Sequence, residues 1–239
     1  MADHSPNPVL CALDTKDQDR AQSLARALRG TIGGLKVGLE YFSATGLDGM
    51  KAISGIGMPV FLDLKLHDIP NTVAHAVEAL VPLQPFMMTI HTAGGSAMMR
   101  AAADAARDAA RKLSIPRPLM VGVTVLTSLD GHDLHEMGID ASPADQVRRM
   151  AALAQEAGLD GVVCSPHEIA KLRNDCGSSF TLVVPGIRPA GASLGDQKRV
   201  MTPAQALAAG ATHLVIGRPI TEASDPRAAA ETIARELGH

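Results

Sequence analysis

The chain has very few aromatic residues, with no tryptophan, one tyrosine and four phenylalanines among its 239 residues. Proteins that bind single-stranded nucleic acid stack bases on aromatic rings, and this sequence has too few rings to do so. Its formal net charge of −3 also provides no overall positive field that could neutralise phosphates. We therefore expect small-molecule partners and no binding of nucleic acid.

Long apolar runs and disulfide patterns are also missing. The longest strongly apolar stretch covers only Leu119 to Leu126, whereas a membrane-spanning helix needs about 20 residues. The first residues, Met1 to Pro8, contain neither the basic nor the apolar region of a secretory signal. Three cysteines without a Cys-x-x-Cys pair fit a reducing compartment. We expect a cytoplasmic protein with no membrane partner.

The sequence does contain a regular alternation of short apolar runs with longer helical stretches. Continuous apolar runs between helices are typical of a parallel sheet that is covered on its faces. Eight such units, spaced by about 25 to 35 residues, match the size of an α/β protein with a (β/α)8 TIM barrel. A doubly wound open sheet is the alternative, but the first run ends in ALDTK rather than in a Gly-x-Gly-x-x-Gly turn. The strands are expected at Val9 to Asp14, Leu35 to Leu39, Val60 to Leu66, Phe86 to His91, Leu119 to Leu126, Gly161 to Ser165, Thr181 to Ile187 and His213 to Gly217.

No linker rich in serine, glycine or proline divides the chain. We therefore expect a single domain over residues 8–239 after a flexible tail at residues 1–7. Helices are expected at Asp17 to Leu28, Ser96 to Leu113 and Ser142 to Ala157. The last of these begins with Ser-Pro, which places a capping residue and a first-turn proline where each is favoured.

Charged residues close several of the predicted strands, and the working groups of a barrel lie at the carboxyl ends of its strands. In the third run, alternation places Asp63 and Lys65 on the inner side and the intervening leucines under the helices. Inward-facing charges are costly unless each meets an opposite charge. We therefore expect Asp63, Lys65, Asp68 and Lys36 to form an alternating row of acids and amines. An ion-pair network that only stabilises the barrel rim is the alternative.

A second signal indicates a phosphate site after the seventh and eighth strands, where barrels often bind phosphate. Gly217 lets backbone N–H groups approach an anion, and Arg218 and Arg188 add guanidinium donors. The polar stretch Ala190 to Arg199 is long enough to close over a ligand as a flap. Alone, Gly-Arg-Pro is a weak signal that an ordinary turn also explains, but together these features favour a phosphate site.

Six segments of the chain form a recognisable set of motifs: DLKLHDIPNT at Asp63 to Thr72, KVG at Lys36 to Gly38, VTVLTS at Val123 to Ser128, PGIRP at Pro185 to Pro189, GDQKR at Gly195 to Arg199 and VIGRP at Val215 to Pro219. Together these motifs resemble the orotidine 5'-phosphate decarboxylase family. The resemblance covers nearly the whole chain in the family's motif order, and the ten-residue segment at Asp63 to Thr72 is highly specific. It implies a TIM barrel that converts orotidine 5'-monophosphate to UMP and CO2, the last step of pyrimidine biosynthesis, without a metal or organic cofactor.

The resemblance also implies roles for individual residues. Lys65 would donate a proton to C6 of the pyrimidine, beside Asp63 and an Asp68 that the second subunit of a homodimer contributes. Asp14 and Lys36 would bind the ribose. The other implied contacts are Thr72 to the ribose across the dimer interface, Thr127 and Ser128 to the pyrimidine edge, and Arg188, Gln197, Gly217 and Arg218 to the phosphate and the flap.

Two other functions share some of these features. A Mg²⁺-dependent phosphosugar decarboxylase or aldolase would have the same Asp-x-Lys-x-x-Asp spacing, and a non-catalytic phosphonucleotide-binding barrel would keep the Gly-Arg pair. The segment His132 to His135 has ligand-like spacing, but we expect a solvated loop because no third ligand is evident. His67 and His91, at strand ends, are expected to be structural.

Overall fold

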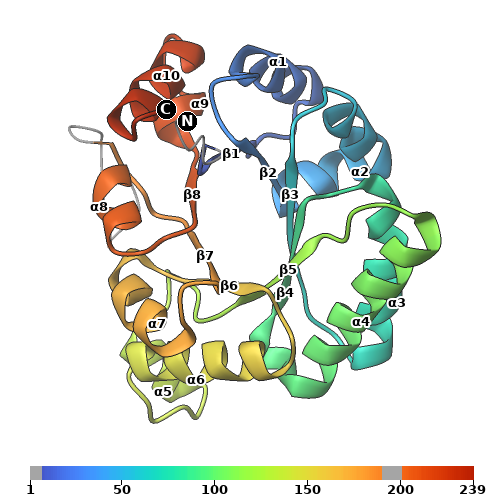
Figure 1. Cartoon of the computed structure of the whole chain (residues 1–239), viewed down its shortest axis with the longest axis vertical. Helices are drawn as coiled ribbons and strands as arrows, with labels where there is room; N and C mark the ends of the chain where they lie inside the picture. Colours follow the sequence, from blue (N-terminus) through green and yellow to red (C-terminus); the bar gives the residue numbers. More distant parts are fainter. Residues whose placement is uncertain (1–6, 190–200) are drawn as a thin grey trace.

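In the computed structural model, residues 7–189 and 201–239 are described, and they form a closed barrel of eight parallel strands in sequence order. Each strand pairs with its neighbours in the sequence, and β1 (Val9–Ala12) closes the ring by pairing with β8 (His213–Ile216). Figure 1 shows the strands at the centre with the helices around them. The predicted TIM barrel is therefore confirmed, and the open sheet is excluded.

The strands coincide with the predicted apolar runs, but most end earlier than predicted. β1, for example, ends at Ala12; the N–H of Leu13 still donates to the carbonyl of Lys36 in β2, and the chain then enters the loop above the barrel at Asp14. The pattern misses this boundary because loop residues such as Leu13 are buried and apolar as well. The six strands between β1 and β8 are Gly34–Gly38 (β2), Val60–Leu66 (β3), Met87–His91 (β4), Leu119–Val123 (β5), Gly161–Val163 (β6) and Thr181–Val184 (β7).

The three predicted helices are present, and their ends follow from local capping. The Asp17 carboxylate accepts the N–H groups of Asp19 and Arg20 at the start of α1, and the Ser142 hydroxyl caps α6. The helices are α1 (Gln18–Leu28), α2 (Leu39–Ser54), α3 (Pro70–Leu80), α4 (Gly95–Leu113), α5 (Gly131–Glu136), α6 (Pro143–Glu156), α7 (Ile169–Cys176), α8 (Pro203–Ala208), α9 (Arg218–Thr221) and α10 (Pro226–Glu236).

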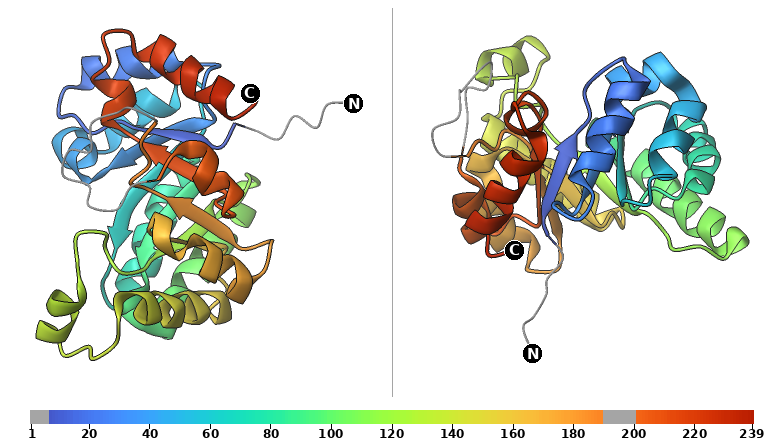
Figure 2. Two further views of the ribbon diagram at one scale, coloured as in Figure 1. Left: turned by 90° about the vertical axis from the view of Figure 1, so that its left-hand side faces the viewer. Right: turned by 90° about the horizontal axis from the view of Figure 1, so that it is seen from above.

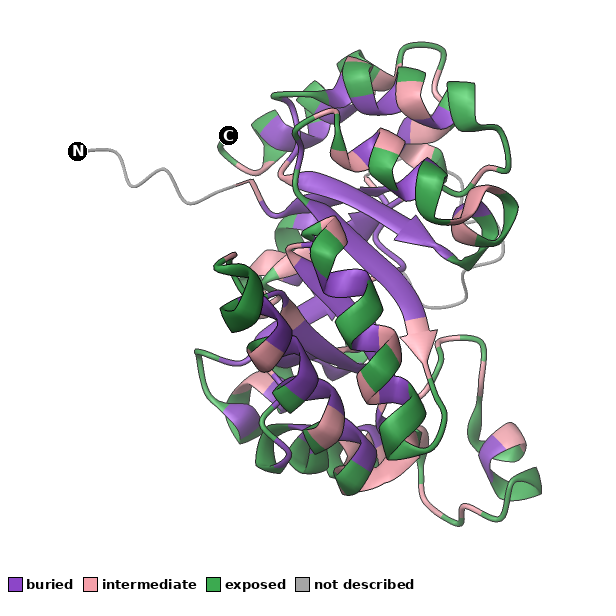
Figure 3. Ribbon diagram, turned by 90° about the vertical axis from the view of Figure 1, so that its right-hand side faces the viewer, coloured by how far each residue is buried: buried purple, intermediate pink, exposed green. Residues whose placement is uncertain are grey.

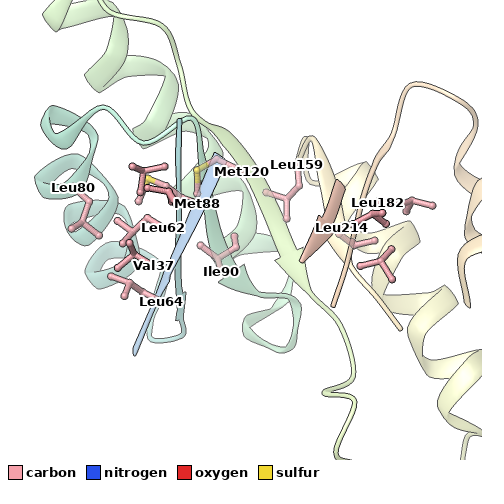
Figure 4. Close-up of a cluster of buried hydrophobic side chains, with 14 of the residues drawn as sticks. Val37, Leu62, Leu64, Leu80, Met88, Ile90, Met120, Leu159, Leu182 and Leu214 are labelled. Atoms are coloured by element: carbon pink, nitrogen blue, oxygen red, sulfur yellow. The ribbon is translucent and has the colours of Figure 1, made fainter. Parts of the chain in front are cut away.

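Two apolar layers hold the barrel together. Phe61 and Met87 belong to a small cluster inside the ring of strands, whereas Leu62 and Leu64 belong to the larger cluster between strands and helices. Figure 3 shows the buried strands, and Figure 4 shows part of the larger cluster, including Leu62 and Leu64. Each fully buried aliphatic side chain stabilises the fold by about 1.5–3 kcal/mol. Because side chains fill the inner layer, the polar groups above it sit on a rigid floor.

The segment His132 to His135 forms a helix rather than the predicted loop. It lies in the short helix α5, where Asp130 and Asp133 form a capping box. Both histidines are exposed and pair with acids of the same segment, His135 Nδ1 lying 2.7 Å from Asp140 Oδ1. Figure 2 shows α5 standing away from the barrel. Over residues 7–189 and 201–239, no group of three or more His, Cys, Asp or Glu side chains could hold a metal ion.

Two predicted segments fall largely outside the described residues. The flap at Ala190 to Arg199, with Gln197, lies outside them, and so does the predicted tail except for Asn7. The Asn7 side chain accepts the N–H of Val9 and donates to the carbonyl of Thr31. None of the described helices is long and apolar enough to span a membrane.

Candidate active site

A cavity of about 540 Å³ opens at the carboxyl ends of the strands. This volume lies in the range of about 300–1,000 Å³ that is typical of small-molecule sites. Inward-facing strand residues such as Phe61 and Val215 form an apolar floor, and charged side chains stand around it. The cavity brings together most of the predicted site residues of one chain: Asp14, Lys36, Asp63, Lys65, Thr127, Arg188, Gly217 and Arg218.

Four charged side chains form a continuous row along one side of this cavity. Lys65 Nζ lies 2.8 Å from Asp63 Oδ2, and Lys36 Nζ lies 3.7 Å from the same oxygen. Lys36 Nζ also lies 3.0 Å from Asp14 Oδ1. The side chains of Lys36 and Asp63 are only 11% and 10% exposed, so each charge depends on its neighbours. The row ends in Lys65, whose side chain is 30% exposed and borders the cavity.

The second acid of the row differs from the prediction. Asp14, which follows β1, is the second acid and lies at the Lys36 end of the row, whereas the spacing had predicted Asp68 next to Lys65. Among the described residues Asp68 forms no ion pair, and its Oδ1 accepts the N–H of Ile69. Asp68 and Thr72 are exposed beside the start of α3, outside the cavity lining. Ser128 is likewise exposed and outside the lining, whereas its neighbour Thr127 borders the cavity.

The β3 backbone changes conformation at its carboxyl end. Lys65 has φ +52°, and the pairing of β3 with β4 shifts register between Leu62 and Leu66. A non-glycine residue in this left-handed region is uncommon and clusters at functional sites. The Lys65 N–H is accepted by the hydroxyl of Thr89, which in turn donates to Asp63 Oδ1. Thr89 was not among the predicted site residues, although its hydroxyl stands out within the apolar run Phe86 to His91.

Gly38 is a second residue that the sequence analysis did not single out. A Cβ atom at this position would lie 2.8 Å from Lys36 Nζ and 3.5 Å from Asp14 Oδ1. The glycine therefore leaves space for the ammonium group between its two acids. The signal in the sequence was the KVG motif itself, in which the glycine follows the lysine by two residues.

Replacing Gly38 with alanine is expected to lower kcat/KM by about 10- to 100-fold, because the Lys36 ammonium must leave its charge-assisted hydrogen bond. The melting temperature should change little, since the displaced group is the end of a flexible side chain. Steady-state kinetics and thermal unfolding measure the two effects. Gly131→Ala is the matched control, because its Cβ would meet only Pro143 at 3.8 Å. Unchanged kcat/KM in Gly38→Ala would show that the space beside Lys36 is unimportant.

Two guanidinium groups, those of Arg188 and Arg218, also line the cavity. Arg188 is buried, and its Nη1 donates to the carbonyl of Ile187 at 2.9 Å. Burial and the nearby Arg218 both lower the pKa of the Arg188 guanidinium from its usual value. Gly217 and Arg218 line the same part of the site. Two guanidinium groups that line one cavity are suited to bind an anion, and their planar forks match the geometry of phosphate.

The histidines and cysteines near the site are poor candidates for chemistry. His67 and His91 stack with ring centroids 5.3 Å apart. Burial, His67 and Lys65 lower the pKa of His91, so its ring is neutral at pH 7. Cys11, Cys164 and Cys176 are buried free thiols. Burial raises the pKa of Cys11 to about 12 and raises that of Cys164 still further, so neither forms a thiolate nucleophile.

Comparison with known proteins agrees with this geometry. The model of the orotidine 5'-phosphate decarboxylase / HUMPS family matches residues 7–233. The orotidine 5'-phosphate decarboxylase of Paramagnetospirillum magneticum is 56% identical over 97% of this chain and 99% of its own length. That of Moorella thermoacetica is 52% identical over 98% of this chain and 93% of its own length. A crystal structure of the Lactobacillus acidophilus enzyme of the same name, 38% identical, superposes with a TM-score of 0.85 over 98% of this chain and 100% of that one. The chain therefore belongs to the orotidine 5'-phosphate decarboxylase family.

Proposed function

We propose that this protein converts orotidine 5'-monophosphate to UMP and CO2, the last step of pyrimidine biosynthesis, without a metal or organic cofactor. The observation that carries the proposal is the row Asp14, Lys36, Asp63 and Lys65, which ends in an ammonium group at the cavity. Family membership supports the decarboxylase activity, and the row supplies a means of performing it.

The reaction needs electrostatic help because the ring cannot delocalise the charge that forms. When the bond from C6 to the carboxylate breaks, its electron pair stays on C6 in an sp² orbital perpendicular to the ring π system. A fixed ammonium group directed at C6 stabilises this charge as it develops. Lys65 then transfers a proton to C6, which gives UMP, and the neutral amine regains a proton from solvent. CO2 leaves with no further oxidation or reduction.

Asp63 contributes in a second way. It lies against Lys65, so the substrate carboxylate at C6 must approach a carboxylate of the protein. Two negative charges about 4 Å apart repel by about 4 kcal/mol at an effective dielectric constant of about 20. Loss of CO2 relieves this repulsion. We treat it as secondary to stabilisation of the carbanion by Lys65.

The remaining contacts orient the nucleotide. We assign the phosphate to Arg188, Gly217 and Arg218, with Gln197 of the flap, and the pyrimidine edge to Thr127 and Ser128. The Lys36 and Asp14 pair suits the ribose hydroxyls, because it offers a donor and an acceptor side by side. The phosphate group lies far from the bond that breaks, but the energy of binding it can hold the site in its reactive arrangement.

We further propose a homodimer in the cytoplasm, in which Asp68 and Thr72 of each subunit reach the site of the other. The exposure of both residues outside the cavity of their own chain supports this arrangement. Three buried free cysteines fit a reducing compartment.

The direct test mixes the purified protein with orotidine 5'-monophosphate and follows the loss of its ultraviolet absorbance, with and without EDTA. We expect turnover at equal rates in both samples. A rate that EDTA abolishes would favour a metal-dependent enzyme of the phosphosugar type. Tight binding of UMP without turnover would show that the barrel only binds nucleotides.

A further inference from the structure

We propose that Thr89 is a positioning residue for the decarboxylation, because its one hydroxyl orients the Asp63 carboxylate and holds the Lys65 backbone. The inference rests on the proposed function, and it adds a residue that does not line the cavity. Thr89 lies in the middle of β4 and is 1% exposed. It therefore acts only through the residues that it contacts.

The pairing of β3 with β4 explains why a hydroxyl is needed here. Phe61 and Leu62 pair with Met87 and Met88, but the next pair is Leu66 with Ile90. Residues 63–65 of β3 therefore lie opposite the single residue Thr89 of β4. A bulge of this kind disrupts the ladder of backbone hydrogen bonds. The N–H of Lys65 is instead accepted by Thr89 Oγ1 at 2.9 Å.

The direction of both hydrogen bonds follows from the chemistry of the groups. A backbone N–H can only donate, so the Thr89 oxygen accepts from Lys65 and its single hydrogen is left for Asp63 Oδ1, 3.0 Å away. The two lysines approach the other oxygen, Oδ2. Thr89 thus fixes the rotation of the carboxylate, which keeps Oδ2 turned toward the ammonium groups. The same atom stabilises the left-handed backbone from which the Lys65 side chain starts.

An apolar residue of the same shape would fill the same space but would provide neither bond. The N–H of Lys65 would lose its acceptor, and Asp63 would be free to rotate. A misplacement of about 1 Å in a reacting group can cost about 10²-fold in rate. Because Thr89 does not touch the cavity, nucleotide binding should be largely unaffected.

The test compares Thr89→Val, which removes only the hydroxyl, with Thr89→Ser, which keeps it. For Thr89→Val we expect kcat to fall by about 10- to 100-fold with KM and UMP affinity within about threefold. Thr89→Ser should retain at least about a third of the wild-type kcat, because its hydroxyl can form both bonds. Thr31→Val is the matched control: its buried hydroxyl donates to Leu28 O at 2.7 Å, just before β2 at the other end of the barrel.

Three results would overturn the inference: a normal kcat in Thr89→Val, an equal loss in Thr89→Ser, or an equal loss of kcat in Thr31→Val. If Thr89→Val does not fold, Thr89→Cys replaces it, since a thiol has similar size and hydrogen-bonds weakly. The same fall in kcat at constant KM is then expected, and its absence counts equally against the inference. A wild-type protein that does not turn over orotidine 5'-monophosphate would instead contradict the proposed function itself.

Discussion

Replacing Lys65 with alanine is expected to lower kcat by at least about 10³-fold, because in the proposed mechanism one side chain supplies both the stabilising charge and the proton. UMP should still bind within about threefold of its wild-type affinity, since we assign the phosphate and ribose contacts to other residues. Asp63 keeps its bond from Thr89 and its ion pair with Lys36, so its charge remains compensated after the change. Single-turnover kinetics and calorimetric titration with UMP measure the two quantities.

Lys51→Ala is the matched control for the loss of a lysine. Lys51 lies on α2, is largely exposed and pairs only weakly, with Asp48 at 3.5 Å. Its removal should leave kcat unchanged. Lys65→Arg separates the two roles of Lys65, because arginine keeps a positive charge but does not release a proton at neutral pH. A near-normal kcat in Lys65→Ala would remove this residue from the mechanism, and another proton donor would then be required.

The barrel and the inward direction of Asp63 could be predicted because both follow from local patterns. Eight apolar runs separated by helical stretches leave few arrangements other than a closed parallel sheet. Alternation along β3 then assigns Asp63 to the inside and Leu62 and Leu64 to the helices, as the structure shows. The left-handed Lys65 could not be predicted in this way. It depends on a register shift against β4, and strand pairing is a property of the folded chain rather than of either segment.

The composition of the charged row shows the same limit. The spacing in the sequence suggested Asp68 as the second acid of the row, because Asp68 follows Lys65 by three residues. In the structure the chain turns at the end of β3 and carries Asp68 to the start of α3. Asp14 reaches Lys36 instead, because β1 and β2 are paired with Ala12 opposite Lys36. The acid that completes the row within one chain is therefore 22 positions from its lysine, a separation that short-range spacing does not reveal.

Mixing two inactive variants is expected to restore activity if each site needs residues of both subunits. In an Asp68→Asn homodimer both sites lack the Asp68 carboxylate, and in a Lys65→Ala homodimer both lack the ammonium group. A hybrid of the two has one site with both defects and one with neither. When the hybrid is isolated through a different affinity tag on each chain, we expect about half of the wild-type activity per dimer. Steady-state decarboxylation by the purified hybrid is the measurement.

The reciprocal hybrid makes the experiment decisive. A wild-type subunit paired with a subunit carrying both substitutions has one defect in each site when Asp68 acts across the interface, so it should be nearly inactive. When Asp68 acts within its own chain, the wild-type subunit keeps an intact site, and the outcomes of the two hybrids are reversed. If purification through both tags recovers no dimer and the protein runs as a monomer in size-exclusion chromatography, the shared site is contradicted as well. The position of Asp68, exposed just before α3 and outside the cavity of its own chain, favours the first pattern, because within its own chain its carboxylate accepts the N–H of Ile69 and forms no ion pair with Lys65.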